Sequence, residues 1–254
     1  MLARARSLQA RALPHGWPDV VRQIALFAAA YYGYRIVRGA VYGRAATAFE
    51  NARNLIDAER TLHVFVEPTV QAWASGSHLV VDVASWIYIN CQTTITLSAL
   101  IWLYLFRNES FYFVRNMMVV GMVLALVGYV ALPTAPPRFF PEWGFVDSVA
   151  QFTGVSSDSV AIDALFNPYA AVPSMHVAFA LMIGWPLARL VRWNVLRMFW
   201  AAYPFLVTFV IVVTANHFLT DAFLGACTAA IAACTASWLA RARPAAWAFA
   251  PASA

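Results

Sequence analysis

The chain has 254 residues, of which 62% are apolar and 11% charged, whereas a soluble domain carries roughly 25% charged residues. With a mean hydropathy of +0.64, this composition excludes a water-soluble globular protein. The net charge of +5 comes from 17 arginines and no lysine, and most of these arginines lie in short gaps between apolar runs. That pattern indicates membrane topology and not nucleic-acid binding.

Residues 1–19 are basic and lack an apolar core, so we expect a cytoplasmic tail and not a signal peptide. Six apolar segments follow, each long enough to cross a bilayer as a helix: 20–42, 79–106, 111–132, 172–190, 195–214 and 217–240. They predict an all-α fold, a polytopic six-helix bundle that forms a single membrane domain over residues 20–240. Residues 241–254 are expected to form a second cytoplasmic tail.

Between the first two spans, residues 44–74 alternate charged and apolar side chains at near-helical spacing, and Pro68 interrupts the pattern. Glu59 belongs to the charged set and Ile56 to the apolar set. We expect an amphipathic helix that lies at the membrane interface and is broken before residues 69–74.

The distribution of arginines predicts the orientation, because positively charged loops resist translocation. With the amino terminus inside, eleven arginines lie on the inner side and at most six on the outer side. We therefore expect both termini in the cytoplasm of an integral plasma-membrane protein. The outer face then holds the long loop 133–171, the start of the fourth span and the turn between the fifth and sixth spans.

The first of three notable segments at that face, residues 132–139, contains three prolines and Arg138. The prolines stop a helix and hold Arg138 near the depth of a lipid headgroup, where its planar guanidinium suits a phosphate. The alternative is a plain helix stop with an arginine anchored among the headgroups.

The second segment, residues 171–176, opens the fourth span. Because Pro173 suits the first helical position, the backbone amides of Ser174, Met175 and His176 are expected to point out of the helix end, which attracts anions. The Ser174 hydroxyl and the His176 imidazole add a hydrogen-bond donor and a proton donor. The alternative is that Ser174 only caps the helix and His176 packs locally.

The third segment, residues 214–221, opens the sixth span and places His217 and Asp221 four residues apart, on one face of a helix. The carboxylate can then fix the imidazole tautomer and leave the other ring nitrogen as a nucleophile or base. A purely structural His–Asp pair is the alternative.

Together the three segments supply what phosphoryl transfer needs: a cation, a helix-end anion site, an acid, and a nucleophile with its orienting carboxylate. Through Pro173-Ser174-Met175-His176 and through His217 with Asp221, the chain resembles the type 2 phosphatidic acid phosphatase superfamily over roughly residues 48–240. The proline-rich segment, the bulky Met175 and the asparagine before His217 resemble its inositol phosphorylceramide synthase branch, which contains inositolphosphotransferases.

The resemblance implies roles for the matching residues. His217 would attack phosphorus and become phosphohistidine, Asp221 would orient it, and His176 would protonate the leaving alcohol. Ser174 and the backbone around Met175 would hold the non-bridging oxygens. The resemblance implies no metal, and we expect no cofactor.

Two positions depart from the family pattern. Arg138 is the nearest match to the family's first cation, although its spacing is looser. Ordinary members carry an arginine six residues before the nucleophilic histidine, and this chain has Ile211 there. The resemblance therefore favours the synthase-like branch over the phosphatases.

We accordingly expect a membrane phosphotransferase that acts on a lipid phosphate ester, with an alcohol such as a polyol as partner, or a phosphatase with water as acceptor. The loop 140–168 is polar enough to bind a headgroup or acceptor, through Asp147, Gln151, Asp158, Asp163 and Asn167. An alternative of another class is a transporter in which Asn90, Gln92, Thr93 and Thr94 line a polar path, but the sequence lacks an inverted repeat and interrupted helices.

Overall fold

The computed structural model describes residues 13, 15–40, 43–154 and 169–244, with the side chains of 37–40 excepted. All regular elements in these ranges are helical, and one isolated bridge joins Thr134 to Ala170. In chain order the elements are α2 (Gly16–Ala40), α3 (Ala45–Thr61), α4 (Glu67–Ser75), α5 (His78–Phe106), α6 (Asn108–Ala131), η1 (Pro137–Phe139), η2 (Pro141–Trp143), α7 (Ser148–Thr153), α9 (Met175–Leu190), α10 (Asn194–Val213) and α11 (Leu219–Ala242).

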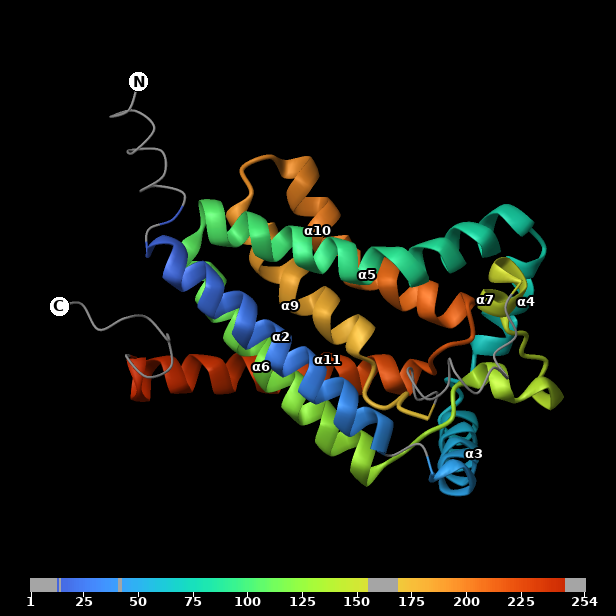
Figure 1. Ribbon diagram of the computed structural model, residues 1–254. Helices are drawn as coiled ribbons and strands as arrows, with labels where there is room; N and C mark the ends of the chain where they lie inside the picture. The colour runs from blue at the N-terminus through green and yellow to red at the C-terminus, as the bar shows by residue number, and fades with distance from the viewer. Residues whose placement is uncertain (1–12, 14, 41–42, 155–168, 245–254) are drawn as a thin grey trace.

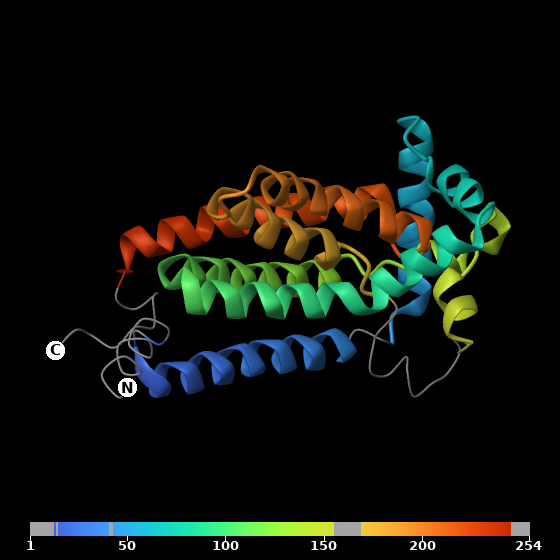
Figure 2. The same cartoon turned by 90° about the horizontal axis from the view of Figure 1, so that it is seen from above.

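The long helices α2, α5, α6, α9, α10 and α11 form one bundle, in which α2 and α6 run together and cross α11 at an angle (Figures 1 and 2). The central helix is α9, which packs against α5, α6, α10 and α11. Helices α3, α4 and α7 gather at the end of the bundle that lies opposite the beginning of α2 and the end of α11. The beginnings of α9 and α11 lie at this same end, so two of the three segments that the sequence singles out meet there.

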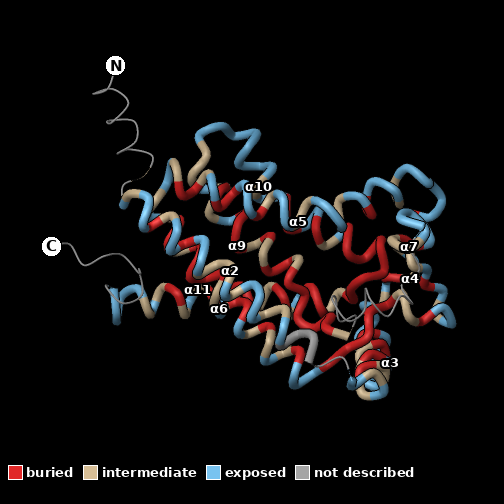
Figure 3. Tube along the Cα trace, viewed as in Figure 1, coloured by how far each residue is buried: buried red, intermediate tan, exposed pale blue. Residues whose placement is uncertain are grey.

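Four helices in the described part of the chain, α5, α6, α10 and α11, are long and apolar enough to cross a membrane. Their outward faces are exposed along most of their length, as lipid contact requires (Figure 3). Helices also form where the other two spans were expected, but α2 is not among the four, and α9 is a shorter apolar helix of 16 residues, about 24 Å long. The predicted count of six spans therefore goes beyond what length and composition support.

The segment 44–74 differs from the single broken helix that the sequence predicts. It forms two helices, and Pro68 lies in the first turn of α4, where a missing amide hydrogen costs nothing, so it starts that helix and breaks none. The buried residues of α3 are Ala48, Ala52, Ile56 and Glu59, which follow one face of the helix. The expected position of Glu59 on the polar face is therefore wrong.

At the other end of the bundle, buried polar groups join α2 to α5 and α6. Asp19 on α2 accepts hydrogen bonds from the hydroxyls of Tyr104 at 2.9 Å and Tyr112 at 2.7 Å. Its other oxygen accepts from Gln23 at 2.8 Å, and Gln23 in turn accepts from Arg115 on α6. Because these groups are buried within a bundle of apolar helices, their mutual bonds fix α2 against its neighbours.

The close approach of α9 to α11 depends on Gly225. A Cβ atom built on this glycine would lie 2.3 Å from the carbonyl oxygen of Ser174, so the two backbones can meet only without a side chain. We expect Gly225→Ala to lower the free energy of unfolding by about 1–3 kcal/mol or more, since neither backbone can move without disturbing the site. Thermal melting in detergent measures this, with Gly33→Ala on α2 as a control, because a Cβ there meets nothing within 4 Å. Equal melting temperatures for the two variants would contradict this packing.

Candidate active site

The two histidines that the sequence singles out lie against each other. The ring centroids of His176 and His217 are 5.4 Å apart, and the ring planes are inclined by 63°. His176 is in the first turn of α9 and is half-buried, whereas His217, in the turn between α10 and α11, is 6% exposed. Two distant parts of the chain thus bring one partly accessible and one buried imidazole into a single site.

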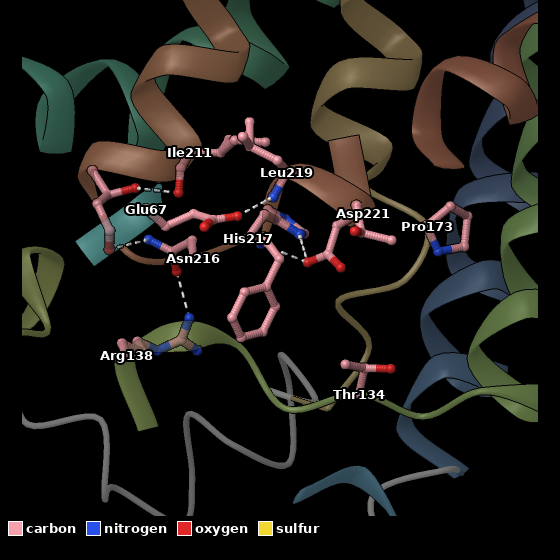
Figure 4. Close-up of polar contacts among 12 residues, drawn as sticks. Glu67, Thr134, Arg138, Pro173, Ile211, Asn216, His217, Leu219 and Asp221 are labelled. Carbon is pink, nitrogen blue, oxygen red and sulfur yellow. Dashed lines mark hydrogen bonds and ion pairs between the residues drawn. The ribbon is translucent and has the colours of Figure 1, made fainter. Parts of the chain in front are cut away.

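His217 and Asp221 form the expected pair, but by a different route. His217 Nδ1 lies 3.2 Å from Asp221 Oδ2, which also accepts a hydrogen bond from the amide of Phe218 at 3.0 Å (Figure 4). Helix α11 begins at Leu219, so His217 precedes it and the two residues do not share a helical face. Instead Asp221 folds back from the first turn of α11. Because Nδ1 faces this fully buried carboxyl group, Nε2 is the ring nitrogen turned away from it.

The turn before His217 is held by the backbone of Ile211. The amides of Asn216 and His217 donate to the Ile211 carbonyl at 3.0 and 3.3 Å, and the buried Ala215 adopts a φ of +51°, which is unusual for a residue other than glycine. The Ile211 side chain is fully buried in an apolar cluster that includes Tyr203. This position therefore supplies no cation to the site but anchors the chain that carries His217.

Arg138 lies beside the same turn, in η1. Its guanidinium bonds to Asn216 Oδ1 (Figure 4). Its amide donates to the Ala215 carbonyl at 2.9 Å, and the guanidinium pairs with Asp147 at 3.5 Å. Arg138 thus braces the residue next to His217. The Arg138 guanidinium has five N–H donors, and only those that do not bond to Asn216 or Asp147 could bind a phosphate.

The beginning of α9 corrects two details of the second segment. The helix starts at Met175 with Ser174 as its N-cap, so Pro173 precedes the cap and does not occupy the first helical position. The Ser174 amide donates to the Asp221 carbonyl at 3.0 Å and is therefore not directed at an anion. Of the three amides expected to point out of the helix end, only those of Met175 and His176 remain candidates for this role.

The Ser174 side chain does not act as a helix cap. Its hydroxyl makes no capping bond, is fully buried, and has no hydrogen-bond partner among the residues that the structure describes. A buried hydroxyl without a partner is costly, so such a group is expected where a ligand oxygen completes its bonding. The alternative in which Ser174 only caps α9 is wrong.

Tyr88, in the middle of α5, stacks on His176 with the ring centroids 4.6 Å apart and the planes inclined by 22°. Beside this stack lies a cavity of about 10 Å³, lined by Tyr88, His176, Tyr203 and Ile211 among others, which is room for about one water molecule. Sequence reasoning missed Tyr88, since an aromatic residue inside an apolar run carries no signal of its own. It also missed Glu59 and Glu67, which lie buried against the beginning of α11.

The polar loop contributes less than expected where it is described. Asp147 pairs with Arg138 and also caps α7 by accepting from the Ala150 amide at 2.9 Å. Gln151 is exposed on α7. The remaining polar residues of the expected acceptor loop, Asp158, Asp163 and Asn167, lie outside the described residues.

A family model matches residues 53–235, which is well over half of the chain, and its description is the PAP2 superfamily. No curated protein and no solved structure matches the chain. The matched range contains every candidate site residue discussed above: Arg138, Ser174, Met175, His176, His217 and Asp221. The chain therefore belongs to the PAP2 superfamily.

Proposed function

We propose that this protein is a membrane phosphotransferase that acts on a lipid phosphate ester through a phosphohistidine intermediate and passes the phosphate-containing group to an alcohol such as a polyol. Membership of the PAP2 superfamily suggests a phosphatase or phosphotransferase that acts on lipid phosphates. The observation that carries the mechanism is that the His176 and His217 rings lie against each other, with their centroids 5.4 Å apart, and that Asp221 is hydrogen-bonded to His217.

The chemistry follows from the two ring environments. With Nδ1 hydrogen-bonded to Asp221, His217 attacks phosphorus through Nε2, so that a P–N bond forms as the P–O bond to the leaving alcohol breaks. His176 donates its proton to the leaving oxygen. In the second half-reaction, neutral His176 takes a proton from the acceptor hydroxyl, the acceptor oxygen bonds to phosphorus, and the P–N bond breaks.

In this mechanism two neutral hydrogen-bond donors and one cation bind the non-bridging oxygens of the phosphate. The buried Ser174 hydroxyl needs a partner, and the Met175 amide begins α9, where the helix dipole favours negative charge. Arg138 adds the positive charge that the apolar Ile211 position does not supply. Such preorganised donors stabilise charge that develops in the transition state.

The acceptor is tested directly by product analysis. Purified protein is incubated with labelled lipid phosphates, with and without candidate polyols, and the products are identified by mass spectrometry. We expect a polyol phosphate product when the polyol is present. Inorganic phosphate alone, at an unchanged rate, would support the alternative of a lipid phosphate phosphatase with water as acceptor.

We expect turnover to survive an excess of EDTA. The proposed mechanism needs only imidazole, carboxyl, hydroxyl and guanidinium groups, and no three His, Cys, Asp or Glu side chains in the described residues converge as a metal site requires. Initial rates with and without EDTA should agree within about twofold. In a metal-activated mechanism the metal stabilises the transition-state charge by several kcal/mol, so its removal would lower the rate by about 10²-fold or more. Loss of activity that added divalent metal restores would contradict the proposal.

We also propose that α2 and α9 cross the bilayer with the four longer helices, which gives six spans and both termini in the cytoplasm of the plasma membrane. Helix α2 packs along α6, and α9 occupies the centre of the bundle. The excess of arginines at the inner ends supports this orientation. The site then faces outward. Helix α3 lies across the end of the bundle (Figure 2), which in this orientation is the outer membrane interface.

A transporter is disfavoured by the positions of the polar residues on α5. Asn90, Thr93 and Thr94 are exposed on the outside of the bundle, and Asn90 donates to the Trp86 carbonyl of its own helix at 2.9 Å. Gln92 is half-buried and lines the small cavity beside Tyr88 and His176, which has a volume of about 10 Å³. The three exposed residues therefore do not line a path through the bundle, and the cavity at Gln92 holds only about one water molecule.

A further inference from the structure

Two glutamates outside the histidine site lie buried against the beginning of α11. Glu59 comes from the last turn of α3 and Glu67 is the first residue of α4, and they are 1% and 0% exposed. Glu67 Oε1 accepts from the Leu219 amide at 2.7 Å, close to His217 (Figure 4). Glu59 Oε1 accepts from the amide and the hydroxyl of Thr220, at 2.9 and 2.6 Å.

These bonds replace an ordinary helix cap. The first amides of an α-helix have no partner within the helix, and the N-cap side chain usually accepts from one of them. The N-cap of α11 is Phe218, whose side chain has no acceptor atom. Three carboxyl groups take the first amides instead, through the bonds Phe218 to Asp221, Leu219 to Glu67 and Thr220 to Glu59. The turn that carries the candidate nucleophile is thus held from α3 and α4.

The two glutamates also face each other. Their carboxyl groups are within hydrogen-bonding reach, and the Oε2 atom of each is buried without a donor among the described residues. Two ionised carboxylates in such a place repel, and a bond between them requires a proton. Burial raises the pKa of Glu67 to about 7 and raises that of Glu59, with the Asp221 carboxyl adding to the latter.

The hydrogen bonds indicate which group carries the proton. Glu59 accepts two donors, both from Thr220, and these favour its ionised form. Glu67 Oε1 accepts from the Leu219 amide, whereas its Oε2 has no donor in the described part of the chain and can hold the hydrogen and donate it to Glu59. One proton shared between the two carboxyl groups then completes the arrangement.

We propose that Glu59 and Glu67 form a carboxylic acid–carboxylate pair that shares one proton, and that the pair positions the beginning of α11, and with it His217, for phosphoryl transfer. The positioning part rests on the proposed function, whereas the shared proton does not. Both glutamates act through the helix and are not catalytic residues. A shift of about 1 Å in a reacting group can cost about 10²-fold in rate, which makes such bracing effective.

Glutamine variants show whether the hydrogen bond between residues 59 and 67, or only the charge of the two glutamates, positions the helix. In Glu67→Gln the amide oxygen still accepts from Leu219 and the amide nitrogen donates to Glu59, so the bonding pattern survives. In the double variant Glu59→Gln/Glu67→Gln, two amide nitrogens face each other and the central bond is lost. We expect kcat within about threefold of wild type for the single variant and about 10²-fold lower for the double variant, with KM changed less than about twofold. Glu50→Gln, on the exposed side of α3, is the matched control and should leave both parameters unchanged.

Infrared spectroscopy tests the proton itself, without any need for activity. A protonated carboxyl group has a C=O stretch that an ionised carboxylate lacks. At a pH below the Glu67 pKa, the wild-type protein should show this band, and the difference spectrum against Glu67→Gln should remove it. Glu50→Gln should leave the band in place.

The two measurements give distinct outcomes. Three results together support the proposal: the band of the protonated carboxyl group in wild type, a near-normal kcat in the single variant and a low kcat in the double variant. Absence of the band in wild type overturns it. A double variant as active as the single one also overturns it, since the pair would then not position the helix. If His217 never becomes phosphorylated, the proposed function fails, and the infrared result still decides whether the proton is shared.

Discussion

Replacing His217 with alanine is expected to lower turnover of a lipid phosphate by at least about 10⁴-fold, because no other group can take the place of a covalent nucleophile. The fold should survive, since the turn is held by the backbone bond from the residue 217 amide to Ile211 and by the bond from Asn216 to the same carbonyl. The rate of product release in detergent measures the effect, and thermal melting reports on folding.

The control for this variant is His78→Ala, which removes an exposed imidazole at the beginning of α5. It should retain wild-type turnover. If His217→Ala retained more than about a tenth of wild-type activity, a factor worth only about 1.4 kcal/mol of barrier, His217 would not be the nucleophile.

Asp221→Asn is the second variant with a large expected effect, a loss of about 10³–10⁴-fold in kcat. The contacts with the Phe218 amide and with His217 Nδ1 are both made by Asp221 Oδ2. An asparagine nitrogen in that position would lose the Phe218 bond, donate to His217 Nδ1 and favour the tautomer with the proton on Nε2, which cannot attack phosphorus. An asparagine oxygen in that position would keep both bonds but would lack the negative charge that stabilises a cationic imidazole. The equivalent change in the Ser-His-Asp triad costs about 10⁴-fold through the wrong tautomer.

Single-turnover formation of the phosphoenzyme measures the Asp221→Asn effect at the step concerned. Asp82→Asn, which alters an exposed carboxylate on α5, is the control and should behave as wild type. A rate of phosphoenzyme formation within about threefold of wild type in Asp221→Asn would show that Asp221 has only a structural role.

The sequence predicts the helices well because hydrophobic runs report directly on burial in lipid. It fails at 44–74 for a physical reason: the buried face of α3 combines the small residues Ala48 and Ala52 with Glu59, so charge no longer marks the solvent side. The sequence does show that Glu59 falls on the same helical face as Ala48 and Ala52, and this spacing could have indicated its burial.

The proximity of the candidate residues could be predicted because short motifs place His176 and Asp221 in the first turns of their helices and His217 directly before the second of these helices. Their partners could not be predicted in the same way. Tyr88, Glu59 and Glu67 come from helices that are distant in sequence and meet the site only through packing. The same holds for Arg138, whose bonds to Asn216 and Asp147 depend on how the turn after α6 folds onto the turn before α11.

The central claim is that the phosphorus atom bonds covalently to His217 during turnover, while His176 beside it transfers the proton. Brief incubation with a lipid labelled at phosphorus, quenching in alkali to preserve phosphohistidine, and peptide mapping by mass spectrometry test it most directly. The account predicts label on His217 that disappears when an unlabelled acceptor is added, together with slower formation of the label in a His176→Ala variant. Label on another residue, or turnover without any phosphoenzyme in wild type, would contradict it.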